Sequence, residues 1–390
     1  MSKGSLGLLS AYWPEDTPRH AHIPLKTICD VTIRPIADSA PDRSALVHAD
    51  GTLSYGELRQ RVDQCAGALR GRCKSGSRIA IVLSDPVELV VTMLAAFEAQ
   101  ALSLVSVEAP AAEALKAFTP ELIIGDASEP GVPSIGYSEM IALAPAERKQ
   151  RPDFRTPLLA LARPDVRGEV VHNHRTLVAT SIAAGAFYML EPESSAVLLE
   201  PPSTWYSLTM MLAIFNRGAT AWTSWGPNPT TPPARADYVV CSWSTAEHFL
   251  DTQIDNRLPP RIGAGAIVAI EAPFSVSRRR RITRRLKTPV LTLLGRNDLG
   301  PVLGSHPTWF LDDAAGIPLP NVDTRPLNPA DRNPVSIGWD SVAQAELGVR
   351  SALAPAGGDL SEGWLQTGII CEVDPTGLYY LYGDSKFRAV

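Results

Sequence analysis

The chain has 390 residues, of which 45% are apolar and 20% are charged, so it can bury a sizeable core and disorder is excluded as its main state. Its length fits two or three domains, or one large one. With 36 basic and 41 acidic side chains the net charge is −5, which excludes a bulk attraction to nucleic acids or anionic lipids. We therefore expect neither nucleic acid nor a membrane among its partners.

The cysteines and the apolar runs indicate the compartment. The 5 cysteines form no Cys-x-x-Cys pair and have no histidine at metal-ligand spacing. This favours reduced thiols over disulfides or a structural zinc site. The longest apolar run, 89–97, is far shorter than the ~20 residues of a membrane-spanning helix, and the N-terminus has no signal-peptide core. We expect a cytoplasmic protein.

The first 150 residues alternate between apolar strands and helices. Ser54, followed three residues later by Glu57, is a capping box that begins a helix, and Ser84 or Asp85 caps a second one. Strands rich in Ile, Val and Leu between helices predict parallel pairing with the helices on the sheet faces. The expected strands are 44–48, 78–83, 102–107 and 122–124, and the expected helices are 55–70 and 86–99.

The middle of the chain continues this alternation. Its expected strands are 196–199, 219–223, 238–241, 265–270 and 290–294, and its expected helices are 176–190, 208–216, 244–250 and 276–286. From about residue 316 the pattern changes to short alternating segments and turns. We therefore predict an α/β fold with a body over 1–315, made of two intertwined subdomains, and a β-rich subdomain over 316–390.

Positive charge is concentrated in one place, where six arginines fall between 278 and 285. On the expected helix these arginines point to several faces. We interpret the run as a solvated surface rather than as a nucleic-acid site.

Several segments, in order, resemble one enzyme family. The segment ALVHADGTLSYGELRQRVDQCAGAL (45–69) resembles the opening of the adenylate-forming enzymes, which include acyl-CoA synthetases, luciferases and the adenylation domains of peptide synthetases. The likeness includes YWPEDTPRH (12–20), PPRIGAGAIVAIEAPFS (259–275), LLGRNDLGPVL (293–303) and GWLQTGIICEVDPTGLYYLYG (363–383). The resemblance covers most of the chain. It implies a large body of layered, mostly parallel sheets and helices, followed by a small β-rich subdomain.

In that family a loop rich in Ser, Thr and Gly, followed by Lys-Gly, wraps the ATP phosphates. The corresponding segment is LLALARPDVRGEVVHNHRTL (158–177), whose first half lacks those hydroxyls and glycines. Pro164 has no N–H to donate, and Asp165 places negative charge where a triphosphate would lie. The resemblance leaves Arg163 and Arg167 as the candidates for phosphate contact.

A second motif of the family, Tyr-Gly-x-Thr-Glu, stacks its ring near adenine and helps to hold magnesium through its Glu. Here it reads Leu294, Gly295, Arg296, Asn297 and Asp298. The leucine has no phenol ring. Asp298 is a weak candidate for magnesium binding and for catalysis, and Gly295 and Asn297 remain candidates for nucleotide contact.

A third motif, Thr-Gly-Asp, binds the ribose hydroxyls through its Asp. Here it reads Thr367, Gly368 and Ile369. Thr367 remains a candidate for nucleotide binding. Ile369 cannot accept a hydrogen bond, and each unpaired ribose hydroxyl would cost about 1–3 kcal/mol. The family continues into a C-terminal domain with a catalytic Lys, which we expect this chain to lack because it ends shortly after Lys386.

Two further assignments follow from the resemblance. His174, at a helix start after the phosphate segment, is a weak catalytic candidate, with capping or packing as the alternative. The acyl pocket of the family would be lined by Trp205, Leu208, Ala272, Leu294 and Gly295. For the aromatic residues, core packing is the alternative. We expect Gly295→Trp to fill this pocket and to leave the unliganded fold largely intact.

These departures predict a degenerate relative of acyl-CoA ligases. It would keep a pocket for a carboxylic acid or acyl compound and bind ATP and magnesium weakly. It would act as a binding partner or as an ATP-independent catalyst. The alternative is an active ligase whose phosphate contacts come from Arg163, Arg167 and Arg296, with its C-terminal domain separate or removed. The protein partners we expect are a second copy, an intact homologue or a carrier protein.

Overall fold

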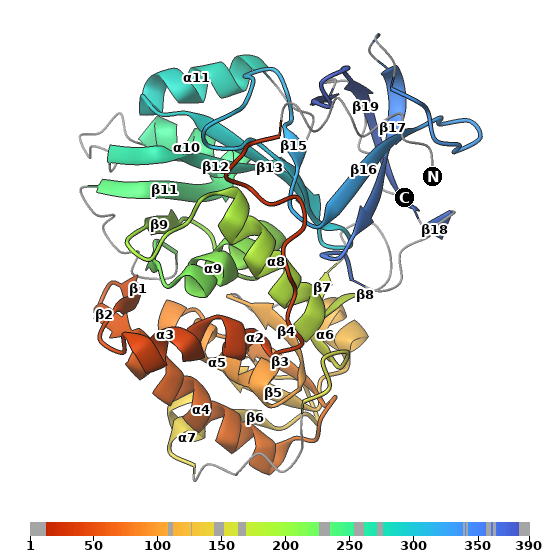
Figure 1. Cartoon of the computed structure of the whole chain (residues 1–390). Helices are drawn as coiled ribbons and strands as arrows, with labels where there is room; N and C mark the ends of the chain where they lie inside the picture. The colour runs from red at the N-terminus through yellow and green to blue at the C-terminus, as the bar shows by residue number, and fades with distance from the viewer. Residues whose placement is uncertain are drawn as a thin grey trace.

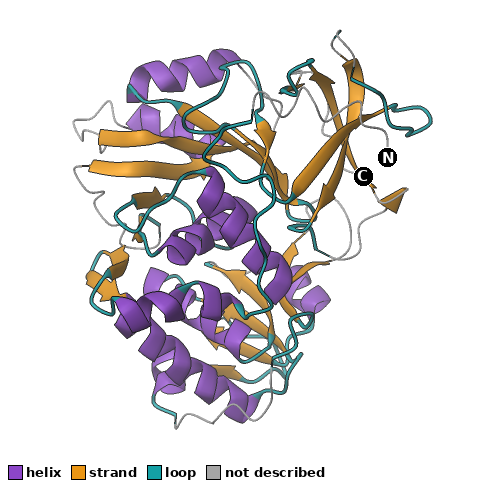
Figure 2. Ribbon diagram, viewed as in Figure 1, coloured by secondary structure: helices purple, strands orange, loops and turns teal. Residues whose placement is uncertain are grey.

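The computed structural model describes residues 13–107, 112–125, 127–143, 152–162, 169–225, 235–252, 261–270, 276–337, 340, 342–355, 360–361 and 364–381. Within these residues the strands form three sheets, and helices pack between and around them (Figure 1). Two of the sheets are flanked by helices, and the third lies to one side with few helices near it (Figure 2). This is the predicted α/β body with a small antiparallel β subdomain.

The six-stranded sheet forms the lower half of the molecule in Figure 1, in the order β6-β5-β3-β4-β7-β8. Its pairs are parallel apart from the antiparallel β7–β8 hairpin. The strands are β3 (Arg78–Val82), β4 (Leu102–Ser106), β5 (Leu122–Gly125), β6 (Ser134–Ile135), β7 (Pro157–Ala162) and β8 (Glu169–Asn173). The helices of this half are α2 (Ile28–Val31), α3 (Ile33–Ser39), α4 (Tyr55–Arg72), α5 (Pro86–Glu98), α6 (Ala112–Phe118) and α7 (Tyr137–Ile141).

The two predicted helix starts in this half are confirmed. Ser54 accepts from the Glu57 backbone N–H while the Glu57 side chain accepts from the Ser54 N–H, which is the expected capping box. Asp85 caps α5, and Pro86 stands at its first position, where a missing N–H costs nothing.

The nine-stranded sheet has the order β15-β14-β13-β12-β11-β9-β10-β1-β2. Its strands are β1 (Ser44–His48), β2 (Gly51–Ser54), β9 (Ser195–Leu198), β10 (Thr220–Thr223), β11 (Arg235–Ser242), β12 (Arg261–Ile270), β13 (Val290–Arg296), β14 (Gly300–Gly304) and β15 (Ile317–Pro318). Its helices are α8 (His174–Phe187), α9 (Trp205–Arg217), α10 (Trp243–Thr252) and α11 (Val276–Leu286). The early strand β1 pairs in parallel with β10, so the two halves share chain segments.

The third sheet is antiparallel and contains β16 (Val322–Leu327), β17 (Val342–Ser351), β18 (Leu360–Ser361), β19 (Trp364–Val373) and β20 (Tyr379–Leu381). Buried and half-buried residues alternate along β19, as expected for a strand with one face on the core. Because β15 pairs with β14, the nine-stranded sheet extends to Pro318.

The arginine run corrects one prediction. Arg279, on α11, is 0% exposed, so the interpretation of the whole run as solvated was wrong for this residue. Its guanidinium donates to the carbonyls of Val290, Leu311 and Ala314, among others. It lies one turn from buried Ile282 on the face that packs against the sheet.

The cysteines and the helices bear on the expected compartment. All five cysteines are free thiols. Among the described residues no helix is both long and apolar enough to cross a membrane.

Candidate functional site

The turn between β13 and β14 carries an internal ion pair. The Arg296 guanidinium donates from Nε to Asp298 Oδ1 at 2.9 Å and from Nη2 to Asp298 Oδ2 at 2.8 Å. A third donor, Nη1, reaches the Thr367 carbonyl of β19 at 2.7 Å. A bidentate pair of this kind fixes both side chains in one geometry. The turn is thereby fastened to the antiparallel sheet.

His172 fastens the same turn to the six-stranded sheet. Its Nε2 lies 3.0 Å from the Asn297 carbonyl, and a carbonyl can only accept, so Nε2 carries the proton. The other ring nitrogen, Nδ1, then faces the Thr176 hydroxyl at 3.4 Å. The ring is 5% exposed, and burial lowers the pKa of His172 to about 4, so the imidazole is neutral at pH 7.

Three of the segments singled out in the sequence therefore meet at one junction. The phosphate segment forms the β7–β8 hairpin and contributes His172, the second motif contributes the turn, and the third contributes Thr367. Arg163 and Arg167 lie in the segment 163–168, which is outside the described residues.

Within the third motif, the polar groups are engaged by the sheet. The Thr367 hydroxyl donates to the Leu347 carbonyl at 2.6 Å and accepts from the Ile369 N–H at 3.1 Å. The Gly368 N–H donates to the Glu346 carboxylate at 2.9 Å. Ile369 is 3% exposed on the core-facing side of β19.

The Arg296–Asp298 pair bears on the predicted magnesium ligand. Both oxygens of Asp298 accept hydrogen bonds from the Arg296 guanidinium, so a positive charge of the protein already lies against this carboxylate. Across the described residues there is no group of three or more His, Cys, Asp or Glu side chains that could hold a metal ion. Asp298 as a magnesium ligand stays a prediction, and a metal there would share the carboxylate with Arg296.

Two of the residues predicted to line an acyl pocket, Trp205 and Gly295, are in close contact. A Cβ on Gly295 would lie 2.6 Å from Cζ3 and 2.7 Å from Cη2 of the Trp205 ring, and 2.5 Å from the Gly300 carbonyl oxygen. Only glycine lets the ring approach β13 this closely. Leu208 and Leu294 are buried nearby in the same core, whereas Ala272 lies outside the described residues.

This contact corrects the expectation for Gly295→Trp. A backbone oxygen and a buried ring already fill the space where the new side chain would begin. The substitution cannot leave the fold intact, because even its first carbon overlaps atoms that are themselves packed.

Comparisons with known proteins can now be set beside this geometry. Residues 34–119 match a family model described as AMP-binding enzyme. Over 66 residues the chain is 36% identical to bacitracin synthase 3 of Bacillus licheniformis; the match spans 17% of this chain and 1% of that protein.

Solved structures resemble nearly the whole chain. ATP-bound MatB from Rhodopseudomonas palustris has a TM-score of 0.75 at 17% identity, covering 90% of this chain and 78% of that one. Unliganded MenE, the O-succinylbenzoate coenzyme A synthetase of Bacillus subtilis, has a TM-score of 0.74 at 15% identity, covering 90% and 81%. The artificially fused adenylation–PCP di-domain NpsA-ThdA of Klebsiella oxytoca has a TM-score of 0.75 at 18% identity, covering 92% and 73%.

The chain has the fold of the N-terminal body of these solved enzymes, with mostly parallel sheets and a small antiparallel subdomain. Residues 34–119 are the part that matches the AMP-binding enzyme model. The predicted fold and the predicted resemblance are confirmed.

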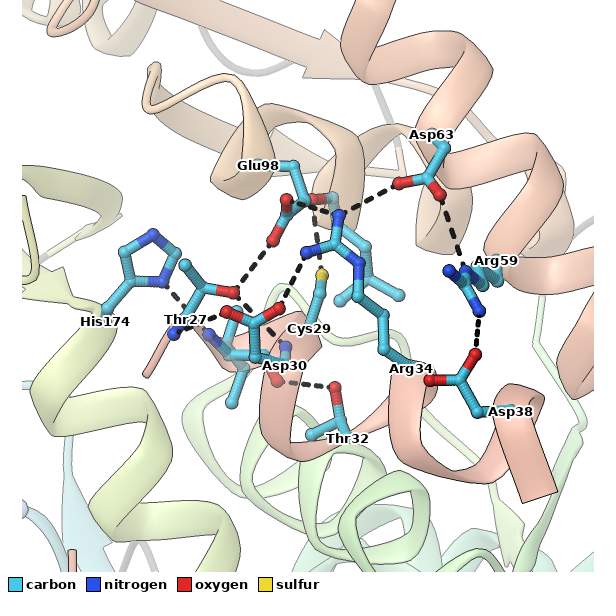
Figure 3. A network of polar contacts seen from close by, with 12 residues as sticks. Thr27, Cys29, Asp30, Thr32, Arg34, Asp38, Arg59, Asp63, Glu98 and His174 are labelled. Carbon is cyan, nitrogen blue, oxygen red and sulfur yellow. Dashed lines mark hydrogen bonds and ion pairs between the residues drawn. The ribbon is translucent and has the colours of Figure 1, made fainter. Parts of the chain in front are cut away.

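In this adenylate-forming fold His174 is part of a polar network on the N-terminal helices (Figure 3). It is 0% exposed, and its Nδ1 accepts the Ile28 N–H of α2 at 3.1 Å. The neighbouring Thr27 hydroxyl donates to Glu98 on α5 at 3.1 Å. These contacts tie α2 to α8 and α5, and they do not involve Asp298, the other catalytic candidate.

Arg34 is the centre of this network, which the sequence analysis missed. It donates to Asp30 at 2.7 Å, Asp63 at 3.0 Å and Glu98 at 2.8 Å, and Glu98 is 1% exposed (Figure 3). Burial alone would raise the pKa of Asp30, but hydrogen bonds from Arg34 and Thr27 outweigh it and hold that pKa below its ordinary value. The network neutralises a buried carboxylate, which is a structural task.

A second cluster missed by the sequence analysis lies where β9 and β11 end. Glu200 accepts from the Ser242 hydroxyl at 2.7 Å and N–H at 3.3 Å, and from the hydroxyls of Thr245 and Tyr206. Tyr206 packs edge-on against Trp205, with ring centroids 5.5 Å apart. Because the carboxyl ends of parallel strands meet at one sheet edge, the spacing of the expected strands was the signal that could have found it.

Proposed function

We propose that this chain is a degenerate relative of the acyl-CoA ligases. It binds a carboxylic acid or an acyl compound in the pocket beside Trp205, it does not adenylate efficiently, and it acts as a binding partner or as a catalyst that does not use ATP. The acyl-CoA ligase-like fold and the AMP-binding segment support the relationship. The junction residues Arg296, Asp298 and Ile369 support the loss of ATP chemistry.

The observation that carries this proposal is the pairing of Arg296 with Asp298. Magnesium prefers carboxylate oxygens, and both oxygens of this carboxylate accept from one guanidinium at 2.8 and 2.9 Å. A metal bound to Asp298 would displace at least one of these charge-assisted hydrogen bonds, worth about 1.5–3 kcal/mol, or lie against the charge of the guanidinium. That cost would be subtracted from the binding of magnesium–ATP.

The ribose position supports the same proposal. Ile369 packs into the core, and the Thr367 hydroxyl donates to Leu347. Neither side chain offers a carboxylate acceptor to a ribose. With the metal carboxylate paired and the ribose acceptor replaced, two separate contacts to the nucleotide are weakened.

Calorimetric titration with ATP and magnesium tests the loss of ATP chemistry. We expect no binding of the wild-type protein in the micromolar range. Arg296→Ala removes the pairing with Asp298 and should tighten magnesium–ATP binding by on the order of tenfold, which is the effect of one charge-assisted hydrogen bond.

The control is Arg350→Ala, which removes a comparable Arg350–Asp323 pair on the antiparallel sheet and should leave ATP binding unchanged. Micromolar binding by the wild-type protein, together with acid-dependent ATP–pyrophosphate exchange, would overturn the proposal. That outcome would favour the active ligase with phosphate contacts from Arg163 and Arg167.

The carboxylate-binding part of the proposal has a separate test. Thermal denaturation is followed with a panel of short-chain, long-chain and aromatic carboxylic acids and their CoA thioesters, without ATP. We expect at least one class to raise the midpoint, and Trp205→Ala, which alters the pocket wall, to change which class does so. If no compound stabilises the protein unless ATP and magnesium are added, the ATP-independent function is refuted.

A further inference from the structure

The exposed side of α11 carries a row of positive charge that the proposed function does not use. Seven of the 36 basic residues of the chain lie between 278 and 287, a stretch without any acidic residue, although the whole chain has a net charge of −5. Arg280, Arg284 and Lys287 are all exposed. We call these three side chains the basic stripe.

The stripe follows one face of the helix. Its members stand at i, i+4 and i+7, with Lys287 directly after the last helical residue, Leu286. Residues at this spacing lie above one another, and the row extends over about 10 Å at a rise of 1.5 Å per residue.

The helix beneath the stripe is rigidly held. The buried Arg279 guanidinium donates to Val290 at 2.9 Å, to Leu311 at 2.9 Å and to the Ser305 hydroxyl at 3.1 Å, and it stacks over the Phe310 ring at 5.1 Å. Ile282, on the same side of the helix, is 0% exposed. The stripe is therefore presented by a helix that is already docked, so binding needs no ordering of the backbone.

The other flank of the helix is partly neutralised. Glu247 of α10 pairs with Arg281 at 2.5 Å and with Arg278 at 3.4 Å. Figure 1 shows α10 beside α11 at the upper edge of the molecule. The acidic side chains of Asp312 and Asp313, which are exposed and follow Leu311, adjoin the anchor of Arg279. Acidic groups thus lie on both sides of the stripe, and the exposed Arg285 adds positive charge on the flank of Arg281.

A straight and preformed row of positive charge favours one kind of partner. The apolar side of α11 is buried in the protein, so the helix cannot insert it into a membrane. A long polyanion would also meet Glu247, Asp312 and Asp313. A helix that lies along α11 with acidic side chains at matching spacing would pair them with the stripe.

We propose that the basic stripe is a docking surface for an acidic helix of a partner protein, which pairs its carboxylates with Arg280, Arg284 and Lys287. Complementary charge at such a surface raises the association rate and selects the partner, and it weakens as salt is added. This surface lies on the outer face of the nine-stranded sheet and is independent of the junction at Arg296.

The test uses two short helical peptides of identical composition. One carries its glutamates at i, i+4 and i+7 on one face, and the other distributes them around the helix. Binding is followed by fluorescence anisotropy at low salt. We expect the one-faced peptide to bind on the order of tenfold more tightly than its isomer, and added salt to weaken that binding.

Charge reversal then tests whether the basic stripe is the surface that binds the peptide. R280E/R284E/K287E should abolish the preference for the one-faced peptide, and the neutral variant R280A/R284A/K287A should reduce it. The control R61E/K116E/R235E makes the same change of charge at exposed sites elsewhere and should keep the preference.

Three results would overturn the proposal. The first is equal binding of the two peptides, which would mean unspecific attraction. The second is loss of the preference in the control variant. The third is tighter binding of single-stranded RNA or of phosphatidylserine vesicles that depends on the same three residues, which would assign the stripe to another class of partner.

Discussion

Arg279 is buried although its neighbours in the sequence are exposed. Six arginines follow one another closely, and the residues on either side of Arg279 are exposed. Its own guanidinium is enclosed, and burial lowers the pKa of Arg279 to about 10 although Asp312 and Asp313 favour its charge. It is therefore still charged at pH 7, and backbone carbonyls solvate it in place of water.

Replacing Arg279 should destabilise the protein strongly. In Arg279→Met the carbonyls of Val290, Leu311 and Ala314 lose their donor while remaining covered. We expect the free energy of unfolding to fall by about 3 kcal/mol or more, because unpaired buried acceptors cost about 1–3 kcal/mol each. Urea denaturation measures the loss. The neighbouring Arg280→Met should change stability by less than about 0.5 kcal/mol, and equal effects of the two variants would contradict the buried role.

Gly295 is a second position where adding one carbon atom should change stability. A Cβ there would lie 2.5 Å from the Gly300 oxygen and 2.6 Å from the Trp205 ring. We expect Gly295→Ala to destabilise the fold by about 1–3 kcal/mol, the usual cost of overpacking. In a double-mutant cycle, Trp205→Ala should make Gly295→Ala less costly, because it removes one of the two obstacles. Strict additivity in thermal or urea denaturation would mean that the ring does not limit this site.

The sequence predicted the bounds of several helices and strands from local patterns such as capping residues and apolar runs. The capping box at Ser54 predicted the start of α4, and the strand at 44–48 and the helix at 276–286 have the bounds that were expected. Helix α9 begins three residues before the prediction, at Trp205, and its N-cap Thr204 makes no side-chain hydrogen bond to the helix. Threonine is a residue type that favours the N-cap, so the sequence held a signal for that start which the prediction did not use.

The capping box gives a quantitative expectation for α4. In Ser54→Ala the Glu57 N–H loses its acceptor at the helix start. Removal of such a cap costs about 0.5–2 kcal/mol, and we expect about 1 kcal/mol here because the position is partly exposed. Ser75→Ala, in an exposed turn, is the matched control and should be neutral. A neutral Ser54→Ala in chemical denaturation would show that the helix is held by its packing alone.

The assembly of the molecule could be predicted less well than its parts. The resemblance led to the fold and to three of the segments that meet at the junction. It did not show that Arg296 would pair with Asp298, or that β1 would join β10 across about 170 residues of sequence. Arg296 and Asp298 are only two residues apart, but the family motif assigned Asp298 to magnesium rather than to its neighbour. The β1–β10 pairing depends on contact between distant segments, which local periodicity does not encode. The Arg34 network was missed for the same reason, since its acids come from three helices.

The junction also makes the stability of the whole molecule sensitive to acid. His172 joins the six-stranded sheet to the β13–β14 turn as a neutral donor, and burial lowers its pKa to about 4. His306 is likewise buried, and its pKa is also lowered to about 4. An unfolded histidine titrates near pH 6.5. Between about pH 4 and pH 6.5 these histidines bind more protons in the unfolded chain than in the folded chain. The free energy of unfolding therefore rises with pH in this range.

We therefore expect stability to be lost as the pH falls from about 6.5 to about 4, with each of the two histidines contributing on the order of 3 kcal/mol. Carboxylates that titrate in the same range add to the loss, so the contribution of His172 is isolated by a difference. In His172→Gln the amide can still donate to the Asn297 carbonyl but cannot be protonated in this range. Urea denaturation at a series of pH values should show that this variant loses less stability on acidification than the wild-type protein. Parallel pH profiles for the two proteins would mean that His172 titrates normally and is not the buried neutral link between the sheets.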